Sequence, residues 1–204
     1  MGAIGHRRPA VDVPSRARAA EPPTDTAARP LQGAKFRRTG PRLRGVPVPE
    51  YIRDLRTAVG GRLLWLPGVS AIVLNEEGRV LLGRRADLGM WSIIGGIPDP
   101  GEQPAAAVVR EVYEETSVHC VPEKILLVEA LHKVVYPNGD ICQFMDICFR
   151  CRAVGGRARV NDDESLEVGW FAPDALPDLE PFAVARIKQA TEDGPTWFEG
   201  LGEP

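Results

Sequence analysis

Three glutamates close together in the chain, Glu111, Glu114 and Glu115, have the residue type and spacing to hold a metal ion. They belong to segment 103–116, which has no glycine and whose only proline stands in the first turn, where a helix tolerates it. With about 100° of rotation per residue, the three carboxylates fall within an arc of roughly 100° on one face of this predicted helix. Such like charges weaken a helix unless a cation binds among them. In isolation a triplet of this kind is more typical of a solvated face, so its surroundings decide.

The chemistry of the side chains indicates which ion they would bind. Ligation by oxygen alone, without Cys or His, favours a hard cation, Mg²⁺ or, in its place, Mn²⁺. An apolar stripe beside the carboxylates is expected to dock the helix on a sheet, and it consists of Ala105, Val108, Val109, Val112, Tyr113 and Thr116. The carboxylates are therefore expected at the edge of a cleft.

The sequence around the glutamates resembles the Nudix box. It opens with GGIPDPGE at 95–102 and closes with REVYEETSV at 110–118, matching the family pattern from Gly96 to Val118 at every fixed position but one. The exception is Ser117, where the family has a glycine just past the helix. That position often needs a left-handed backbone, which a serine adopts at a cost of about 1 kcal/mol. Ile94 stands where many members have a proline before the double glycine, which weakens any assignment to a subfamily.

The resemblance implies roles for residues of the box. It implies metal ligands at Gly96, through its carbonyl, and at Glu111, Glu114 and Glu115, with Glu111 as an alternative general base, and it implies that Arg110 and Glu102 orient them. A guanidinium fits two carboxylates in bidentate geometry, so Arg110 is expected to clamp Glu102 and Glu111 and to keep Glu111 ionised.

Other candidates lie outside the box. Family members often draw a further glutamate from a later loop, and Glu164 in the acidic stretch 162–167 is the candidate base or extra ligand, with surface charge as an equal alternative. Arg84 and Arg85 end a predicted strand and either contact phosphates or remain solvated. Tyr136 follows the box by 18 residues, where a tyrosine resembles the dinucleoside polyphosphate hydrolases, although sheet packing explains it equally well.

The elements around the box predict an α+β fold. Apolar periodicity and turn residues predict helices at 49–59, 103–116, 174–176 and 182–191, and strands at 69–74, 80–85, 91–95, 125–136, 141–152 and 167–171. The pairs 69–74 with 80–85 and 125–136 with 141–152 flank turn sequences and are expected to form hairpins. Together with the resemblance, this order implies a Nudix-like α/β/α sandwich with a mixed sheet and a loop-helix-loop catalytic box.

Charge divides the 204 residues into a tail and one domain. Residues 1–48 carry ten Arg or Lys against three Asp or Glu, a net charge of +7, and 49–204 carry −10. The first segment is rich in Pro, Ala and Arg and has little apolar periodicity, so it is expected to be a disordered tail, and translation that begins near Val46 is an alternative. With one aromatic residue, Phe36, the tail is a poor match for a nucleic-acid-binding arm.

The sequence also argues against export and a zinc site. No apolar run approaches the roughly 20 residues that span a bilayer, and no secretory signal opens the chain, so a soluble cytoplasmic protein is expected. The four cysteines are expected to be reduced. Cys148 and Cys151 have the spacing of a metal knuckle, but residues three apart on a strand face opposite sides, and no second pair is available to complete a zinc site.

The resemblance implies a Mg²⁺-dependent pyrophosphohydrolase in which water attacks a phosphorus of a diphosphate linkage. Its substrate would be a nucleoside diphosphate derivative: a nucleotide sugar, ADP-ribose, a dinucleoside polyphosphate or a (d)NTP. The alternative is a non-catalytic Nudix domain that senses such a ligand, although a sensor would not need the full carboxylate set. A homodimer through a shared sheet or helix surface is compatible with the resemblance, and the sequence does not choose among these substrates.

Overall fold

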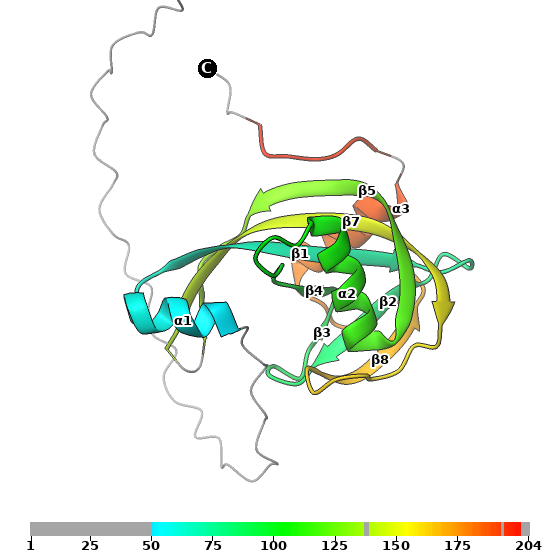
Figure 1. The fold of residues 1–204 in the computed structure, drawn as a ribbon. Helices are drawn as coiled ribbons and strands as arrows, with labels where there is room; N and C mark the ends of the chain where they lie inside the picture. The colour runs from blue at the N-terminus through cyan, green and yellow to red at the C-terminus, as the bar shows by residue number, and fades with distance from the viewer. Residues whose placement is uncertain (1–49, 137–138, 193, 201–204) are drawn as a thin grey trace, which may run out of the picture. The chain divides into compact units, whose positions relative to one another are not determined.

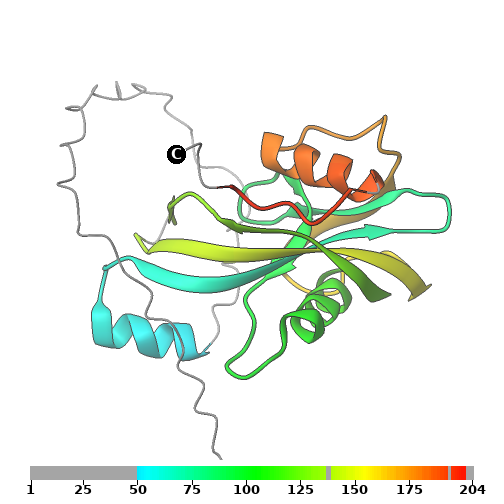
Figure 2. The ribbon, with the colours of Figure 1, turned by 90° about the horizontal axis from the view of Figure 1, so that it is seen from above.

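The structure, a computed structural model, describes residues 50–136, 139–192 and 194–200. In that part a mixed sheet lies between helices: α1 (Glu50–Val59) and α2 (Pro104–Thr116) cover one face, and α3 (Pro181–Thr191) covers the other (Figures 1 and 2). The strands are β1 (Leu64–Leu74), β2 (Val80–Arg85), β3 (Trp91–Ser92), β4 (Ile94–Gly96), β5 (Val118–Ala130), β6 (Val134–Val135), β7 (Ile141–Gly156) and β8 (Ser165–Phe171). The predicted α+β sandwich with a mixed sheet is confirmed.

Strand β1 is the centre of the sheet. It runs parallel to β7, from Leu64 beside Cys142 to Leu74 beside Arg152, and antiparallel to β4. The predicted hairpin with β2 is present only at its turn, where Leu74 faces Val80, because β2 then turns away to pair with β8. Strand β4 thereby carries the first residues of the box into the sheet.

Two apolar clusters lie on opposite faces of the sheet, since successive residues of a strand point to opposite sides. Val73 of β1 belongs to the cluster beneath α2, and Ile72 to the cluster beneath α3. Cys148 and Cys151 of β7 divide in the same way, so the prediction that they do not face one another is confirmed. All four cysteines are free and buried.

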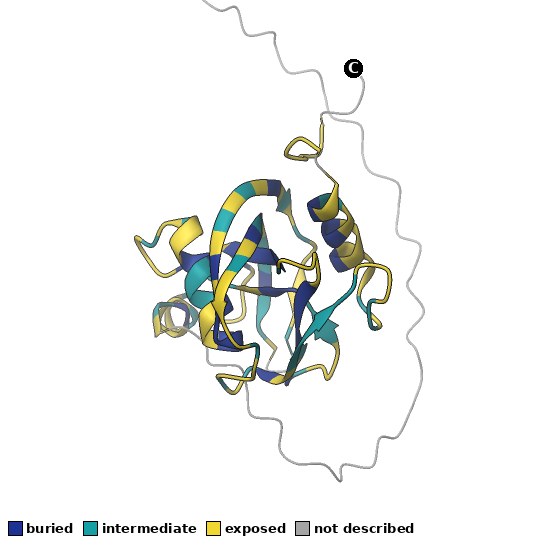
Figure 3. Ribbon diagram, turned by 90° about the vertical axis from the view of Figure 1, so that its right-hand side faces the viewer, coloured by how far each residue is buried: buried dark blue, intermediate teal, exposed yellow. Residues whose placement is uncertain are grey.

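Helix α2 is rotated slightly from the expected orientation. Ala107, Val108 and Val112 are completely buried against the sheet, whereas Ala105 and Tyr113 of the predicted stripe are exposed. Figure 3 shows buried residues gathered where the sheet meets its helices. The rotation matters because it turns Glu115 inward, where it is 9% exposed.

Several expected boundaries differ. The predicted helix 174–176 is not present, and strand β5 begins at Val118, directly after α2, instead of at residue 125. The predicted strand 125–136 is two strands, because β5 ends at Ala130 and β6 covers only 134–135. The hairpin between 125–136 and 141–152 is confirmed by the β5–β7 and β6–β7 pairs. Two residues of its turn, 137 and 138, lie outside the described residues.

The prediction of a disordered tail at 1–48 also lies outside the described residues. Helix α1 begins at Glu50, one residue later than expected. It rests on the start of β1 and on the box loop, where Ile52 packs in a cluster with Ile97 and the Tyr51 hydroxyl donates to the Pro98 carbonyl at 3.4 Å. In the described residues, each helix is too short or too polar to cross a bilayer.

Ser117 has the left-handed backbone that its position requires, with φ 57° and ψ 17°. Its amide caps α2 by donating to the Tyr113 carbonyl at 2.8 Å, and its hydroxyl accepts from Nε of Arg159 at 3.1 Å. Ser117→Gly and Ser117→Ala both lose that hydroxyl, but only alanine keeps a Cβ in the strained conformation. We therefore expect the glycine variant to exceed the alanine variant in free energy of unfolding by about 1 kcal/mol in urea titrations. Equal stabilities would contradict this explanation.

Candidate active site

Arg110 ties the box loop to α2. Its Nε and Nη2 donate to the two carboxylate oxygens of Glu102 at 3.0 and 2.8 Å, which is the bidentate contact expected from the sequence. Its Nη1 donates to Glu111 at 3.0 Å and to Glu114 at 2.9 Å. Glu102 also accepts from the Asp99 amide at 3.0 Å, and the hydrogen bonds from Arg110 are the main cause of its lowered pKa. The loop therefore has a fixed position relative to the carboxylate face of the helix.

The carboxyl group of Glu111 lies against the backbone of Gly96. A Cβ placed on Gly96 would come within 2.2 Å of both Cδ and Oε1 of Glu111, so any other residue there would displace this carboxyl group. Burial raises the pKa of Glu111 by more than Arg110 lowers it. Arg110 does lower the pKa of this carboxyl, as expected, but desolvation is the larger effect and the net shift is upward.

Glu115 points from α2 into the sheet. Its carboxylate accepts a hydrogen bond from the Gly95 amide, in the strand that opens the box. On the sheet beneath, a Cβ on Gly83 would lie 3.8 Å from Oε2 of Glu115 and 2.9 Å from the Ser165 hydroxyl. A side chain at Gly83 would therefore be in ordinary contact with Glu115 but would clash with Ser165.

Glu164 completes an acidic cluster with Glu111 and Glu115. Its carbonyl accepts from the Ala86 amide at 2.7 Å and its amide donates to the Asp162 side chain at 2.9 Å, which attaches the loop to the end of β2. Burial, followed by the charges of Asp162 and Glu111, raises the pKa of Glu164 to about 7. The pKa of Glu115 is raised well above its ordinary value, mainly by burial. Repulsion from neighbouring carboxylates adds to this effect, and Glu164 is the largest of those contributors.

This arrangement suits a hard divalent cation. Three carboxylates that repel one another meet at the junction of the box loop, α2 and the 162–164 loop, and a bound cation would reverse the repulsion. Their donor atoms are all oxygen, as Mg²⁺ prefers. In the described residues, no group of three or more Asp, Glu, His or Cys side chains lies close enough together to hold a metal ion, so a bound cation would have to draw these carboxylates closer. Glu114 lies at the surface beside Arg110, with its side chain 52% exposed.

Arg85 provides positive charge beside the cluster. Its Nε and Nη2 donate to the two carboxylate oxygens of Asp87 at 2.9 and 2.6 Å. These bonds are the main reason that the pKa of Arg85 is raised, with smaller contributions from the charges of Tyr136 and Glu115. Arg85 in turn lowers the pKa of Glu164. The structure therefore places two of the candidate substrate residues, Arg85 and Tyr136, near one another, with Arg85 beside the acidic cluster.

Arg84 is not part of this group. Its Nη2 donates to Glu167 of the neighbouring strand β8 at 2.6 Å, in a partly exposed ion pair. The β2–β8 register shifts between Arg84 and Arg85, so the side chains of the two arginines have different surroundings. The solvated alternative that the sequence left open fits Arg84.

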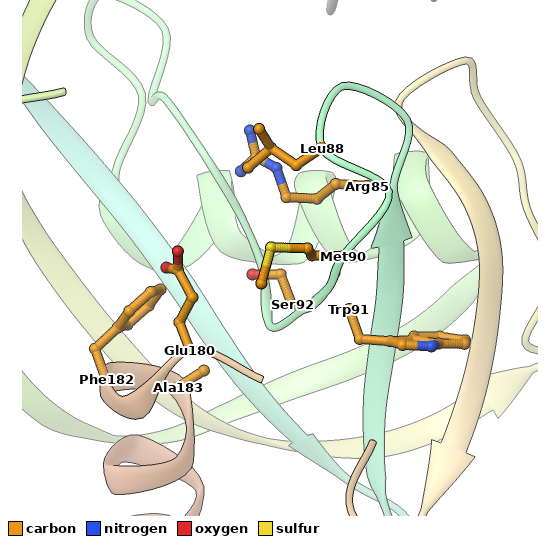
Figure 4. A pocket seen from close by; sticks show the side chains of 8 residues that line it. All are labelled: Arg85, Leu88, Met90, Trp91, Ser92, Glu180, Phe182 and Ala183. Carbon is orange, nitrogen blue, oxygen red and sulfur yellow. The ribbon is translucent and has the colours of Figure 1, made fainter. Parts of the chain in front are cut away.

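A small cavity of about 60 Å³ opens beside Arg85. Figure 4 shows Arg85 and Met90 on one side and Glu180 and Phe182, at the start of α3, on the other. Trp91 also lines the cavity, and its ring packs edge-on against Phe171 with centroids 4.8 Å apart.

Residues 64–193, more than half of the chain, match the family model of the NUDIX domain. The chain belongs to the NUDIX domain family. It is a Nudix hydrolase that acts on pyrophosphate bonds. The family typically uses a divalent metal. The loop, helix and turn from Gly96 to Val118 are the Nudix box, as predicted.

Known proteins resemble this Nudix hydrolase in sequence and in fold. A MutT-like protein of Streptomyces ambofaciens is 33% identical over 129 residues, which is 62% of this chain and 78% of the relative. A putative 8-oxo-dGTP diphosphatase of Bacillus subtilis is 32% identical over 114 residues, 56% of this chain and 71% of the relative. The crystal structure of a MutT protein from Methanosarcina mazei Go1 superposes with a TM-score of 0.53, covering 62% of this chain and 93% of that one, at 24% identity, and shows the fold alone.

Two acidic residues of the Nudix site were not singled out from the sequence. Asp87 fixes Arg85 in bidentate geometry, and Asp162 raises the pKa of Glu164. The Arg-Ala-Asp order at 85–87 was the available signal for the first, since side chains two apart meet when a strand ends in a turn. Nothing in the sequence distinguished Asp162 from Asp163, its neighbour in the same acidic stretch.

Proposed function

We propose that this Nudix hydrolase is a Mg²⁺-dependent enzyme, with Mn²⁺ able to replace Mg²⁺, that cleaves the diphosphate linkage of nucleoside triphosphates. The observation that carries the proposal is the meeting of Glu111 and Glu115, both on α2, with Glu164 of the 162–164 loop, and with Arg85 beside them. An acidic cluster with one adjacent guanidinium fits a cation and a polyphosphate together. Nucleotide sugars, ADP-ribose and dinucleoside polyphosphates are the competing substrates.

The proposed roles follow from the contacts. Glu111 and Glu115, with the Gly96 carbonyl and Glu114 at the rim, would hold the cation. When bound, the cation neutralises phosphate charge and lowers the pKa of the attacking water. Glu164, with a pKa of about 7, is suited to take the proton from that water near neutral pH, and Glu111 is the alternative base. Arg110 and Glu102 position the loop and the helix.

The cavity beside Arg85 supports the choice of substrate. Arg85 reaches both the acidic cluster and the cavity, so a phosphate chain on the cluster would lead the nucleoside toward the cavity. At about 60 Å³ the cavity is too small to enclose a base, but at its mouth Phe182 is 41% exposed and offers an apolar surface to one. The relative from Bacillus subtilis is named for 8-oxo-dGTP, a substrate of the same class. Tyr136, near Arg85, would contact the phosphates or the sugar.

A substrate panel tests the proposal. Metal-stripped protein receives Mg²⁺ and, separately, dGTP, 8-oxo-dGTP, ADP-ribose, UDP-glucose and diadenosine tetraphosphate, and products are identified by chromatography. We expect Mg²⁺-dependent turnover of triphosphates, with a nucleoside monophosphate and pyrophosphate as products. Preferred turnover of another compound would overturn the choice of substrate. Binding without turnover of any compound would favour a ligand sensor.

Stability of the metal-free protein should fall as pH rises. Glu111, Glu115 and Glu164 all have raised pKa values when folded, so the folded state binds more protons than the unfolded state does. For Glu164 the loss begins near the ordinary pKa of 4.5 and continues through about 7. A cation bound among the carboxylates removes this penalty. We therefore expect Mg²⁺ to raise the melting temperature more at about pH 8 than at about pH 5.

Differential scanning calorimetry at the two pH values, with and without Mg²⁺, measures the effect. Glu123→Gln is the control, because Glu123 pairs with Arg150 and Arg152 of β7, away from the acidic cluster. It should leave the pH dependence of the Mg²⁺ effect unchanged. An Mg²⁺ effect of the same size at both pH values would show that these carboxylates do not bind the ion.

A further inference from the structure

A second groove, of about 480 Å³, lies at the C-terminal end of α2 and is separate from the cavity beside Arg85. Its walls are the last turn of α2, the start of β5 and the segment that follows β7. The residues lining it include Tyr113, Ser117, His119, Arg157 and Arg159, and none of the lining residues is acidic. A groove with two guanidinium groups and no carboxylate in its lining favours an anionic ligand.

Arg157 and Arg159 differ in their interactions with the rest of the protein. Nε of Arg159 donates to the Ser117 hydroxyl at 3.1 Å, which fixes the side chain at the wall of the groove. The Arg157 side chain has no hydrogen bond or ion pair in the described part of the chain. By contrast, Arg150 and Arg152 of β7 both pair with Glu123. Among these arginines, Arg157 is thus the one without a partner in the described part of the protein.

An aromatic pair forms another wall. The rings of Tyr113 and His119 are stacked, with centroids 4.8 Å apart and planes 19° apart. Tyr113 remains 44% exposed although it belongs to the helix that docks on the sheet. Stacked rings beside arginines are the combination that receives a base and its phosphate.

The C-terminal end of α2 does not repel an anion in this groove. Backbone amides of the following loop cap the carbonyls that would otherwise face the groove: Arg159 donates to Thr116 at 3.1 Å and Asn161 donates to Glu115 at 3.3 Å. The Asn161 side chain also donates to the Tyr113 carbonyl at 3.1 Å. The negative end of the helix dipole is therefore satisfied by protein groups.

We propose that this groove is a second binding site, for a nucleoside monophosphate or a ligand of that size, with the phosphate on Arg157 and Arg159 and the base against Tyr113 and His119. The site does not depend on the substrate proposed above. Its walls continue through Asn161 into the loop that carries Glu164, so an occupied groove and the acidic cluster share one segment.

Binding of AMP to the full chain in EDTA tests the proposal, because EDTA removes divalent cations from the acidic cluster. Calorimetry gives the affinity, and amide NMR shifts locate the site. We expect shifts at 156–159 and tighter binding of AMP than of adenosine or inorganic phosphate alone. Arg157→Ala should weaken AMP binding about tenfold and Arg157→Lys less, since lysine keeps the charge. The matched control Arg152→Ala should bind like wild type.

Two results would overturn the proposal. One is AMP binding that leaves the amides of 156–159 unshifted. The other is equal affinity in Arg157→Ala and wild type. Arg85→Ala separates this site from the active site: the groove shifts should persist in that variant, whereas shifts that vanish with Arg85 would place AMP in the cavity beside it. Inorganic phosphate that binds as tightly as AMP would exclude a role for the base.

Discussion

Glu115→Gln is expected to reduce kcat about 10³-fold, a change of about 4 kcal/mol in activation free energy, with little change in the fold. Glutamine has the same shape but lacks the negative charge that a cation needs. The neutral side chain also removes repulsion from Glu164 and Glu111. We therefore expect the metal-free variant to melt at a higher temperature than metal-free wild type above about pH 7.

Steady-state kinetics and calorimetry on the same preparations check both parts. Glu123→Gln is the matched control, because it neutralises a glutamate that pairs with arginines on β7, away from the cluster. It should change neither kcat nor the melting temperature of the metal-free protein by comparable amounts. A lower melting temperature in metal-free Glu115→Gln than in metal-free wild type would show that Glu115 stabilises the fold through hydrogen bonds. It would contradict the view that its charge destabilises the protein until a cation binds.

Gly96→Ala is expected to reduce kcat about 10²-fold, the size of effect seen when a reacting group is misplaced by about 1 Å. The added Cβ would lie 2.2 Å from the Glu111 carboxyl carbon, so the carboxyl must move away from the box loop. Arg110 holds the other side of that carboxyl, which leaves little freedom for a harmless adjustment. Binding of metal and catalysis should therefore both weaken.

Gly61→Ala is the control for this substitution, because a Cβ there meets no atom within 4 Å. Circular dichroism establishes that both variants are folded, and kcat is then measured at saturating substrate and Mg²⁺. Wild-type kcat in folded Gly96→Ala would show that the Glu111 carboxyl has no required position next to the loop.

Predictions from the sequence were most accurate for contacts between residues that are close in the chain and whose side-chain chemistry allows few alternative partners. Arg110 and Glu102 were expected to form a bidentate pair, and they do, because both belong to one loop-helix segment and guanidinium geometry leaves few alternatives. The left-handed backbone of Ser117 was expected for the same reason, since it follows from the end of a helix and needs no distant partner. The mixed sheet could be predicted from the order of the elements.

Predictions that depended on tertiary contacts were less successful. The periodicity of α2 gave a stripe that included Ala105 and Tyr113, whereas docking on the sheet exposes both and buries Glu115. Whether Arg84 or Arg85 joins the cluster depends on a register shift between β2 and β8, which are far apart in the chain. The pKa of Glu111 rises because burial outweighs a neighbouring arginine, and burial is not a property of the local sequence.

Binding of Mn²⁺ to metal-stripped full-length protein at about pH 8 tests the central claim most directly, because free Mn²⁺ has a paramagnetic resonance signal that disappears on binding. The central claim is that Glu111 and Glu115 hold a divalent cation at the Nudix box. We predict that wild type binds Mn²⁺, that Mg²⁺ displaces it, and that Glu111→Gln combined with Glu115→Gln abolishes binding while Glu123→Gln does not. Mn²⁺ binding by the double variant as tight as that by wild type would contradict the account.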